Sequence, residues 1–481
     1  MKKITSITYG AAFMAVLVIS TIFIDISCTD NATSGDNTNP GTSVTDVETT
    51  SGPAGYGLPA LSGKVPLEVD FTGFKGGSPV NARPFFDIFS WEMFIALNWP
   101  VDANKRGVPL TPNEPNTFLS MTNSTPVVWT SYKNQFDLFG QEDKRPSPWN
   151  SLKNEVNPLN SGKSPMHIFG TAKGAMIGGV EIDEAFSFPL IDQSKNYTLF
   201  EMRYNETQYN FIRGKDRDST SWFYFRKNLS NYLMDHNDSL EMPWSVAATN
   251  TYGALMVKAA WKELIDGEDE SLYYVINQEV YDPISKSLKT KKLGLVGLHL
   301  VQKLDKFKRW IWSSFEHRNN VPGQGSQQPY SYNDVTDTIP TKGGWANRPN
   351  TNKVVKKDSR TPAQVTRYNE IPITPADSST VVINEAYQKL LENTVWKNYQ
   401  LVITQWPSQD TSFAIYGNYP NKGYPKFAGG AFPVDGCTNT VAETYFQDAA
   451  DATGKGGNSC MSCHYQTSST DFSWSLNVKA H

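Results

Sequence analysis

Cysteine and histidine are scarce in this chain, which has four cysteines and six histidines among 481 residues. So few cysteines exclude a small fold held together by many disulfides. Apart from residues 4–24, no apolar run is long enough to cross a membrane. Positive and negative charges nearly balance, with 44 basic and 48 acidic side chains and a net charge of −4, so we expect no nucleic-acid partner.

Several motifs of common enzymes are also missing. There is no G-x-S-x-G nucleophile elbow, no glycine-rich phosphate loop and no H-E-x-x-H zinc motif. The acidic run at residues 266–270 shows no acid-base pair, and we interpret it as a solvated turn. Aromatic side chains, in contrast, are abundant, with 13 Trp, 22 Tyr and 25 Phe. This composition predicts a large globule of one or two domains with an aromatic-rich core.

One motif near the carboxyl end carries specific chemistry. It reads Cys460-Met461-Ser462-Cys463-His464 and has the form C-x-x-C-H. Two thiols at this spacing can add to the two vinyl groups of one porphyrin, and the histidine that follows can bind the iron. The motif therefore predicts one covalent haem c on Cys460 and Cys463, with His464 as the proximal iron ligand.

Two other uses of these cysteines stay open. Cys460 and Cys463 can form a disulfide, or they can join Cys437 and a histidine around zinc. Zinc sites usually use two ligand pairs, and adjacent side chains such as Cys463 and His464 rarely converge on one small ion. We therefore favour haem. Cys437 is then left without a disulfide partner, as a buried thiol, an iron ligand or a redox-sensitive group.

The amino-terminal end predicts export and lipidation. A basic head, Met1-Lys2-Lys3, precedes the apolar residues 4–24, and Ser27-Cys28 follows them. We interpret residues 1–27 as a lipoprotein signal peptide that ends at a lipidated Cys28. Export agrees with the haem motif because haem c is attached outside the cytoplasm.

The alternative at this end is an uncleaved membrane anchor, and Asp25 departs from the usual lipoprotein pattern. The polar residues 28–55 predict a flexible tether. Thr29, rather than an aspartate, follows Cys28, which favours the outer membrane of a Gram-negative bacterium. We therefore expect a lipid-anchored protein in the periplasm or on the cell surface.

The body of the chain predicts an α+β fold that is mainly antiparallel β with peripheral helices. Asp87 and Asn384 are predicted helix N-caps. Residues 319–379 predict a long loop that wraps the core or covers a site. The predicted strands are residues 197–204, 253–264, 273–281, 292–302, 307–316 and 399–406, the fourth and fifth as a hairpin, and the predicted helices are residues 88–97 and 385–391. This gives an α+β body at residues 56–430 and a haem segment at 431–481 that packs on it, rather than a separate small cytochrome domain.

Residues 89–100, 257–261, 294–299, 310–317 and 439–446, together with the haem motif and residues 471–473, follow a recognisable pattern. They resemble bacterial lipoproteins of a cytochrome c family that carry a single C-terminal C-x-x-C-H motif. The resemblance covers most of residues 85–480. It implies covalent haem on Cys460 and Cys463 with His464 on the iron, and it implies no role for any other residue.

The second axial ligand is harder to assign. No methionine follows His464, so the ligand must be His481, an upstream residue, or none. His299, on a predicted aliphatic strand, is a candidate distal ligand or an ordinary core histidine. If the hairpin turns at residues 304–306, His299 faces Ile311, and His317 lies on the same face about 20 Å away as solvated surface. His167, Met166 and His236 have weaker claims.

These observations predict an exported mono-haem cytochrome that passes electrons to or from a redox partner protein. A haem enzyme acting on peroxide, oxygen or nitric oxide at an open distal site is one alternative. The other is an extracellular ligand-binding module with an accessory haem, because the body is much larger than electron transfer requires.

Overall fold

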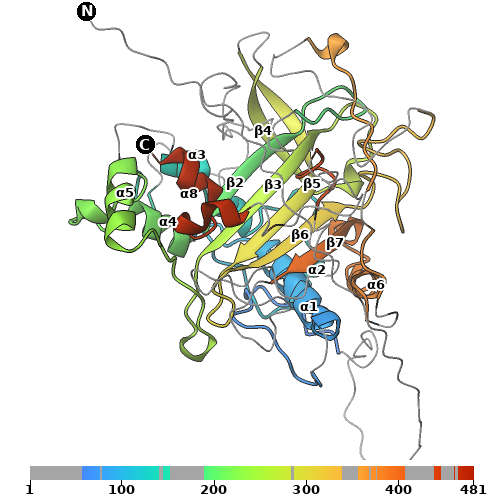
Figure 1. Ribbon diagram of the computed structural model, residues 1–481. Helices are drawn as coiled ribbons and strands as arrows, with labels where there is room; N and C mark the ends of the chain where they lie inside the picture. The colour runs from blue at the N-terminus through green and yellow to red at the C-terminus, as the bar shows by residue number, and fades with distance from the viewer. Residues whose placement is uncertain are drawn as a thin grey trace, which may run out of the picture. The chain divides into compact units, whose positions relative to one another are not determined.

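One antiparallel β-sheet with helices around it forms the centre of the molecule (Figure 1), which confirms the α+β class. The computed structural model describes residues 57–75, 79–139, 145–151, 189–282, 287–337, 356–367, 370–374, 376, 378–406, 438–445, 460 and 464–480. All of these lie within one compact unit, Thr49–His481.

The sheet contains seven strands within the described residues. Its order is β1-β2-β3-β5-β6-β7, and β4 pairs with the free end of β5, from which it extends in Figure 1. Each neighbouring pair is antiparallel. The strands are β1 (Lys133–Asn134), β2 (Leu199–Tyr204), β3 (Leu255–Glu263), β4 (Val275–Asp282), β5 (Ser287–Gln302), β6 (Ile311–His317) and β7 (Tyr399–Gln405).

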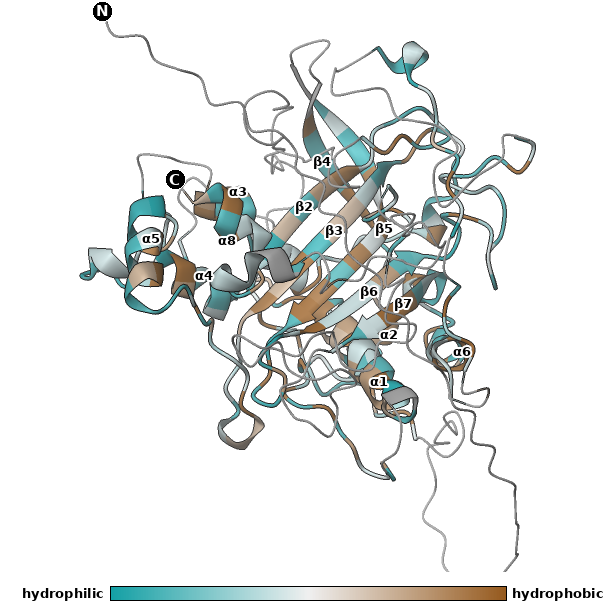
Figure 2. Cartoon of the chain, viewed as in Figure 1, coloured by the Kyte–Doolittle hydropathy of each residue, from teal (hydrophilic) through white to brown (hydrophobic). Residues whose placement is uncertain are grey.

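Both faces of the central strands are covered, which explains their sequence. All seven residues of β6 and all seven of β7 are buried, and hydrophobic residues gather on the strands in Figure 2. Strands with two covered faces tolerate near-continuous apolar runs instead of strict alternation. The predicted strands from residue 197 onward are therefore confirmed, with ends that shift by a few residues.

The predicted hairpin is confirmed, but its register is wrong by three residues. His299 pairs with Ser314, and Ile311 pairs with Gln302. The strands end at Gln302 and resume at Ile311, so the connection is longer than the predicted turn at residues 304–306. Lys303 and Trp310 in this connection are both buried, which a short solvated turn would not allow.

His317 is also corrected by the structure. It follows the partner of His299 by three residues, so the two histidines lie on opposite faces of the sheet. The imidazole of His317 is fully buried and stacks on Tyr273, with ring centroids 4.4 Å apart. Its Nε2 donates to the Leu272 carbonyl at 3.0 Å. Burial lowers the pKa of His317 to about 3.

The helices surround the sheet. In Figure 1, α4, α5 and α8 lie beyond β2, whereas α1 and α6 lie near β7. They are α1 (Pro79–Leu97), α2 (Pro115–Leu119), α3 (Gln135–Phe139), α4 (Glu206–Arg213), α5 (Arg226–Asp235), α6 (Thr380–Leu390) and α8 (Trp474–Lys479), with short 3₁₀ turns η2 (Trp129–Ser131), η3 (Ser219–Ser221), η4 (Ala247–Thr249), η5 (Glu270–Leu272), η6 (Lys357–Ser359), η7 (Val395–Asn398) and η8 (Tyr465–Thr470).

Neither predicted N-cap residue caps its helix. Asp87 lies in the middle of α1, and Asn384 lies inside α6, whose cap is Ser379. Asn384 instead accepts a hydrogen bond from the Trp91 indole at 2.9 Å and donates to the Leu401 carbonyl at 2.8 Å. Both residues join helices to the sheet.

Asp87 belongs to a buried polar network that fixes α1 against one face of the sheet. Its carboxylate accepts hydrogen bonds from the hydroxyls of Thr380 and Thr404, each at 2.7 Å. Ser90, one helical turn later, contacts the hydroxyls of Ser313 and Thr404 at 2.7 and 2.8 Å. Burial raises the pKa of Asp87 to about 6, against the threonine hydroxyls and Arg83, which lower it.

Asp87 makes stability depend on pH. The pKa of Asp87 is higher in the folded chain than the ordinary 3.8, so the protonated carboxyl favours folding. This contribution to the free energy of unfolding is complete below pH 3.8 and is lost as the pH rises to about 6. The loss amounts to about 3 kcal/mol. We expect Asp87→Asn to remove this dependence, measured as the difference in urea unfolding free energy between pH 4 and pH 6.5. If this difference were the same in the wild type and in Asp87→Asn, the assignment of the pH dependence to Asp87 would be wrong.

Parts of the long stretch at residues 319–379 pack on the body. The amide of Val365 donates to the Tyr332 carbonyl at 2.8 Å, and the amide of Ala363 donates to the Ile191 carbonyl at 2.9 Å. Tyr332 and Val365 are fully buried. The described parts of residues 319–379 therefore wrap the core, which was one of the two alternatives predicted for this loop.

Among the described residues, no helix has both the length and the apolar character needed to span a bilayer. The signal peptide, Cys28 and the tether lie outside the described residues, as do Cys437, Cys463, Met166, His167 and His481.

Candidate functional site

A row of cross-strand partners runs over the centre of the sheet, on the face opposite α1. Its members are paired one to the next on adjacent strands and therefore point to the same side. From β2 to β7 the row consists of Met202, Lys258, His299, Ser314 and Ile403. We call it the central row.

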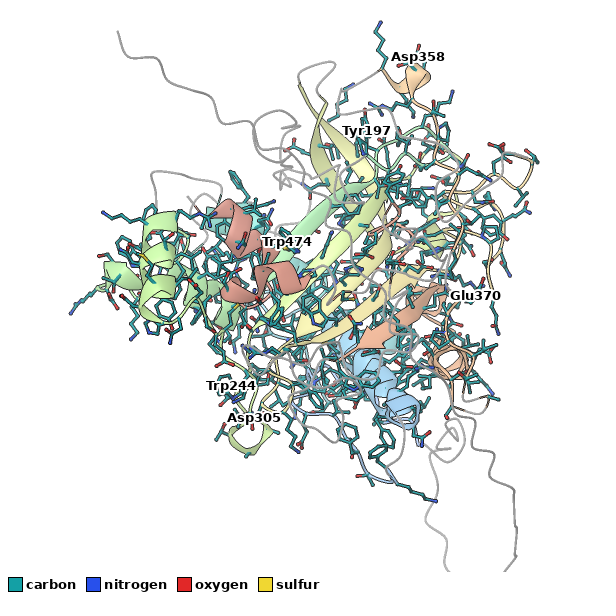
Figure 3. The ribbon with its side chains drawn as sticks, viewed as in Figure 1. Tyr197, Trp244, Asp305, Asp358, Glu370 and Trp474 are labelled. Atoms are coloured by element: carbon teal, nitrogen blue, oxygen red, sulfur yellow. The ribbon has the colours of Figure 1, made fainter. Side chains whose placement is uncertain are left out.

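The carboxyl-terminal segment covers this row along most of its length. The Ser475 hydroxyl donates to the Met202 sulfur at 2.7 Å, which fixes α8 over β2; Figure 3 labels the neighbouring Trp474 beside that strand. Asn439 donates through its side-chain amide to the Ser314 hydroxyl at 3.3 Å. Covering segments thus contact both sides of His299.

The approach of this segment to the sheet is close enough to require glycine. A Cβ on Gly297 would lie 2.6 Å from a methyl carbon of Val441. On the next strand, Glu316 is buried and accepts hydrogen bonds from both the amide and the hydroxyl of Thr440, at 3.1 and 2.7 Å. Its other oxygen accepts from Arg367. Residues 438–445 are therefore held on the sheet by packing and by a charged anchor.

His464, the predicted proximal ligand, has one ring nitrogen engaged by the backbone. Its Nδ1 donates to the Phe472 carbonyl at 2.7 Å. This bond sets the tautomer in which Nε2 is unprotonated and able to bind a metal. Burial lowers the pKa of His464 to about 4, and the positive Lys258 lowers it further, whereas the Phe472 carbonyl and Glu443 raise it. The imidazole is therefore neutral at neutral pH.

Apolar side chains of the sheet contact both described residues of the motif, Cys460 and His464. The ring of Trp312 lies 4.3 Å from that of His464 between centroids, with the planes tilted by 49°. Trp312 is on β6, two residues before Ser314, so it shares the face of the central row. Cys460 is partly buried and packs against Val402 and Ile403 on β7. The described part of the motif thus lies over β6 and β7.

His299 lies at the middle of the central row, between Lys258 and Ser314. Its Nε2 is buried and makes no hydrogen bond. The Glu443 carboxylate is 3.5 Å from this nitrogen, which is beyond the usual N–H···O range. Burial raises the pKa of Glu443, but His299 and Lys258 outweigh that effect and keep it below the ordinary value. Glu443 is therefore an anion beside the imidazole.

The turn that supplies the Phe472 carbonyl is held by a buried ion pair. Lys303 and Asp471 have no exposed side-chain surface, and the ammonium lies 2.5 Å from Asp471 Oδ2. The same oxygen accepts from the Met242 amide at 2.8 Å. Asp471 and Phe472 both have positive φ, 53° and 63°. This anchored turn positions the carbonyl that orients His464.

Several residues of the site were not predicted from the sequence: Glu443, Lys258, Trp312 and the Lys303–Asp471 pair. Each of them reaches the site through strand register or through a contact between distant segments, so no local pattern identifies them. Asp471 is the nearest to an exception, because residues 471–473 belong to the pattern that supports the resemblance.

The described residues suit a haem in two respects. His464 keeps an unprotonated Nε2, and His299 has a buried nitrogen without a hydrogen bond. Within the described part of the chain, no three His, Cys, Asp or Glu side chains form a cluster that could hold a free metal ion. A haem supplies four of the iron ligands itself, so it needs no such cluster.

Comparisons with known proteins add no relative to this picture. No protein-family model matches the chain, and neither the curated proteins nor the solved structures contain a significant match.

Proposed function

We propose that this chain is an exported mono-haem c-type cytochrome that transfers electrons. Cys460 and Cys463 would hold the porphyrin through thioethers, and His464 would bind the iron through Nε2. The hydrogen bond from His464 Nδ1 to the Phe472 carbonyl is the observation that best supports this assignment, because it leaves Nε2 as the ligand nitrogen. When bound, haem c supplies reversible one-electron oxidation and reduction.

The residues around the motif suit an electron carrier. Trp312 and Ile403 provide apolar surface on the sheet, and such surroundings raise the cost of the charged ferric state and so tune the potential. The buried pair of Lys303 and Asp471 holds the proximal turn in one geometry. A rigid ligand environment lowers the reorganisation that accompanies each electron transfer.

Export and lipid anchoring complete the proposal. They rest on residues 1–28, and the resemblance to cytochrome c family lipoproteins agrees with them. The proposed location is the periplasm or the cell surface, with the chain anchored through Cys28 to the outer membrane and a redox protein as its partner.

Intact mass spectrometry tests the proposal directly. The chain, produced with its own signal in a host with cytochrome c maturation, should carry the mass of one haem and of the lipid on Cys28. Its reduced pyridine haemochrome should have the spectrum of a haem with two thioethers. The same chain made in the cytoplasm is the control and should lack both additions. A secreted polypeptide without the mass of haem would overturn the proposal, and so would one whose mass is lower by two hydrogen atoms, as expected for a disulfide.

A further inference from the structure

We propose that His299 is the second axial ligand of the iron, so that the haem is bound by two histidines. The inference rests on the proposed function, because it concerns the distal side of the same haem. Four observations support it: the place of His299 in the sheet, the state of its Nε2, its relation to His464, and the positions of the other described histidines.

The first observation is the place of His299 on the covered face. It belongs to the central row, and one of its cross-strand partners, Ser314, is contacted by Asn439 of the carboxyl-terminal segment. Cys460 packs on the β7 end of that row, and Ser475 contacts its β2 end. A porphyrin attached at Cys460 therefore starts from the face that His299 occupies.

The second observation is the unsatisfied nitrogen. Burying a polar atom without a hydrogen-bond partner is unfavourable, and in native structures such atoms can mark the place of a ligand, ion or water. Nε2 of His299 is such an atom. The neighbouring Glu443 carboxylate is fixed by the Asn439 amide at 2.8 Å and remains 3.5 Å from the imidazole. It therefore adds negative charge, which would favour the ferric state, without taking the nitrogen as a hydrogen-bond donor at normal distance.

The third observation is that His464 lies beside β6, a strand that pairs with His299. The ring of His464 lies 4.3 Å from that of Trp312, measured between centroids, and Trp312 is two residues before Ser314, the cross-strand partner of His299. Two imidazoles that converge on one iron must approach from opposite sides of the porphyrin. His299 extends from the sheet, whereas His464 belongs to the segment that covers it, so the two side chains come from different layers.

The fourth observation concerns the remaining described histidines, which are engaged elsewhere. His317 is on the opposite face of the sheet, where Nε2 donates to the Leu272 carbonyl and Nδ1 accepts from the Asn319 amide. His236 follows the exposed end of α5 and stacks on Tyr232, with ring centroids 3.8 Å apart. Met256 is the competing soft ligand, because it lies two residues from Lys258 on the same face and is buried.

Spectroscopy of the reduced holoprotein tests the inference. The wild type should be low-spin and should not bind carbon monoxide rapidly, because both axial positions are filled. His299→Gly should become high-spin and bind carbon monoxide at once, and added imidazole should restore the low-spin spectrum. The controls are His236→Ala, at an exposed histidine, and Met256→Leu, at the competing ligand. Both should keep the wild-type spectrum.

The outcomes separate the two proposals. Wild-type protein without covalent haem overturns the proposed function, whatever His299 does. Covalent haem that stays low-spin in His299→Gly, or that becomes high-spin in Met256→Leu, overturns only the inference. So does rapid carbon monoxide binding by the wild type, which would indicate an open site suited to catalysis. If His299→Gly does not accumulate, His299→Met should keep a low-spin haem with a higher potential; an unchanged potential overturns the inference.

Discussion

Replacing both Cys460 and Cys463 by serine is expected to abolish covalent haem attachment. A serine hydroxyl does not form the thioether that links each cysteine to a porphyrin vinyl group, so the double variant has no remaining attachment point. Single variants, Cys460→Ser or Cys463→Ser, should keep one link and give less holoprotein. Peroxidase staining of a denaturing gel detects only haem that survives unfolding, and it should be negative for the double variant.

The control for this experiment is Cys437→Ser, which removes the other cysteine of the mature body. It should stain like the wild type, because the motif is intact. A stained band from the double cysteine variant would contradict covalent attachment at the motif. If Cys437→Ser alone removed the stain, Cys437 would have to take part in haem binding, which agrees with the role of iron ligand considered for it above.

Local sequence patterns were sufficient for the strands and for the motif. Strands β3 and β5 are rich in aliphatic residues and β6 contains two aromatic ones, because both faces of these strands are covered, and this composition is visible in the sequence. The beginning of α1 was predicted nine residues too late, because Asp87 was taken as its N-cap; the helix starts at Pro79 and also contains Pro84. A proline is usually taken as a helix boundary, and here tertiary packing overrides that preference.

Strand register could not be predicted, and the site depends on it. The predicted turn at residues 304–306 put His299 opposite Ile311, whereas the observed pairing puts it opposite Ser314. An odd error in register moves a residue to the other face. His317 was accordingly expected on the same face as His299 and at the surface, whereas it is buried on the opposite face.

Residues of the site that come from separate segments share this difficulty. Glu443 reaches His299 only because residues 438–445 lie on the sheet, and Trp312 reaches His464 only because β6 lies under the motif. Both contacts join residues more than a hundred positions apart in the chain. Composition and periodicity describe neighbours along the chain, so they do not report such contacts.

The second large effect is expected at the buried ion pair. Lys303→Met leaves the Asp471 carboxylate without its charged partner in a place that solvent does not reach. Removing one partner of a buried pair costs about 3–5 kcal/mol, because the remaining charge stays desolvated. Glu241, the other carboxylate near Lys303, is 3.7 Å from the ammonium and 42% exposed, so solvent keeps its charge stable when Lys303 is removed. We expect this loss in the free energy of unfolding measured in urea.

The matched control is Lys308→Met, five residues further along the same connection. Lys308 is partly exposed, its Nζ lies 3.8 Å from Asp305 Oδ1, and the same nitrogen lies 3.8 Å from the centre of the Trp244 ring. Figure 3 labels Asp305 and Trp244 close together. Exposed interactions of this kind contribute about 1 kcal/mol or less to the free energy of unfolding. A loss at Lys303 no larger than that at Lys308 would show that the buried pair is not needed for stability.

The double variant Lys303→Met with Asp471→Asn separates charge from shape. The amide can still accept the hydrogen bond from the Met242 backbone, and asparagine tolerates the positive φ of 53° at this position. Since no buried charge remains, stability should return to within about 2 kcal/mol of the wild type. The Phe472 carbonyl would keep its place, so the double variant should also keep the holoprotein spectrum. Lys303→Met, in contrast, should loosen this turn and weaken the low-spin signal before the rest of the chain unfolds.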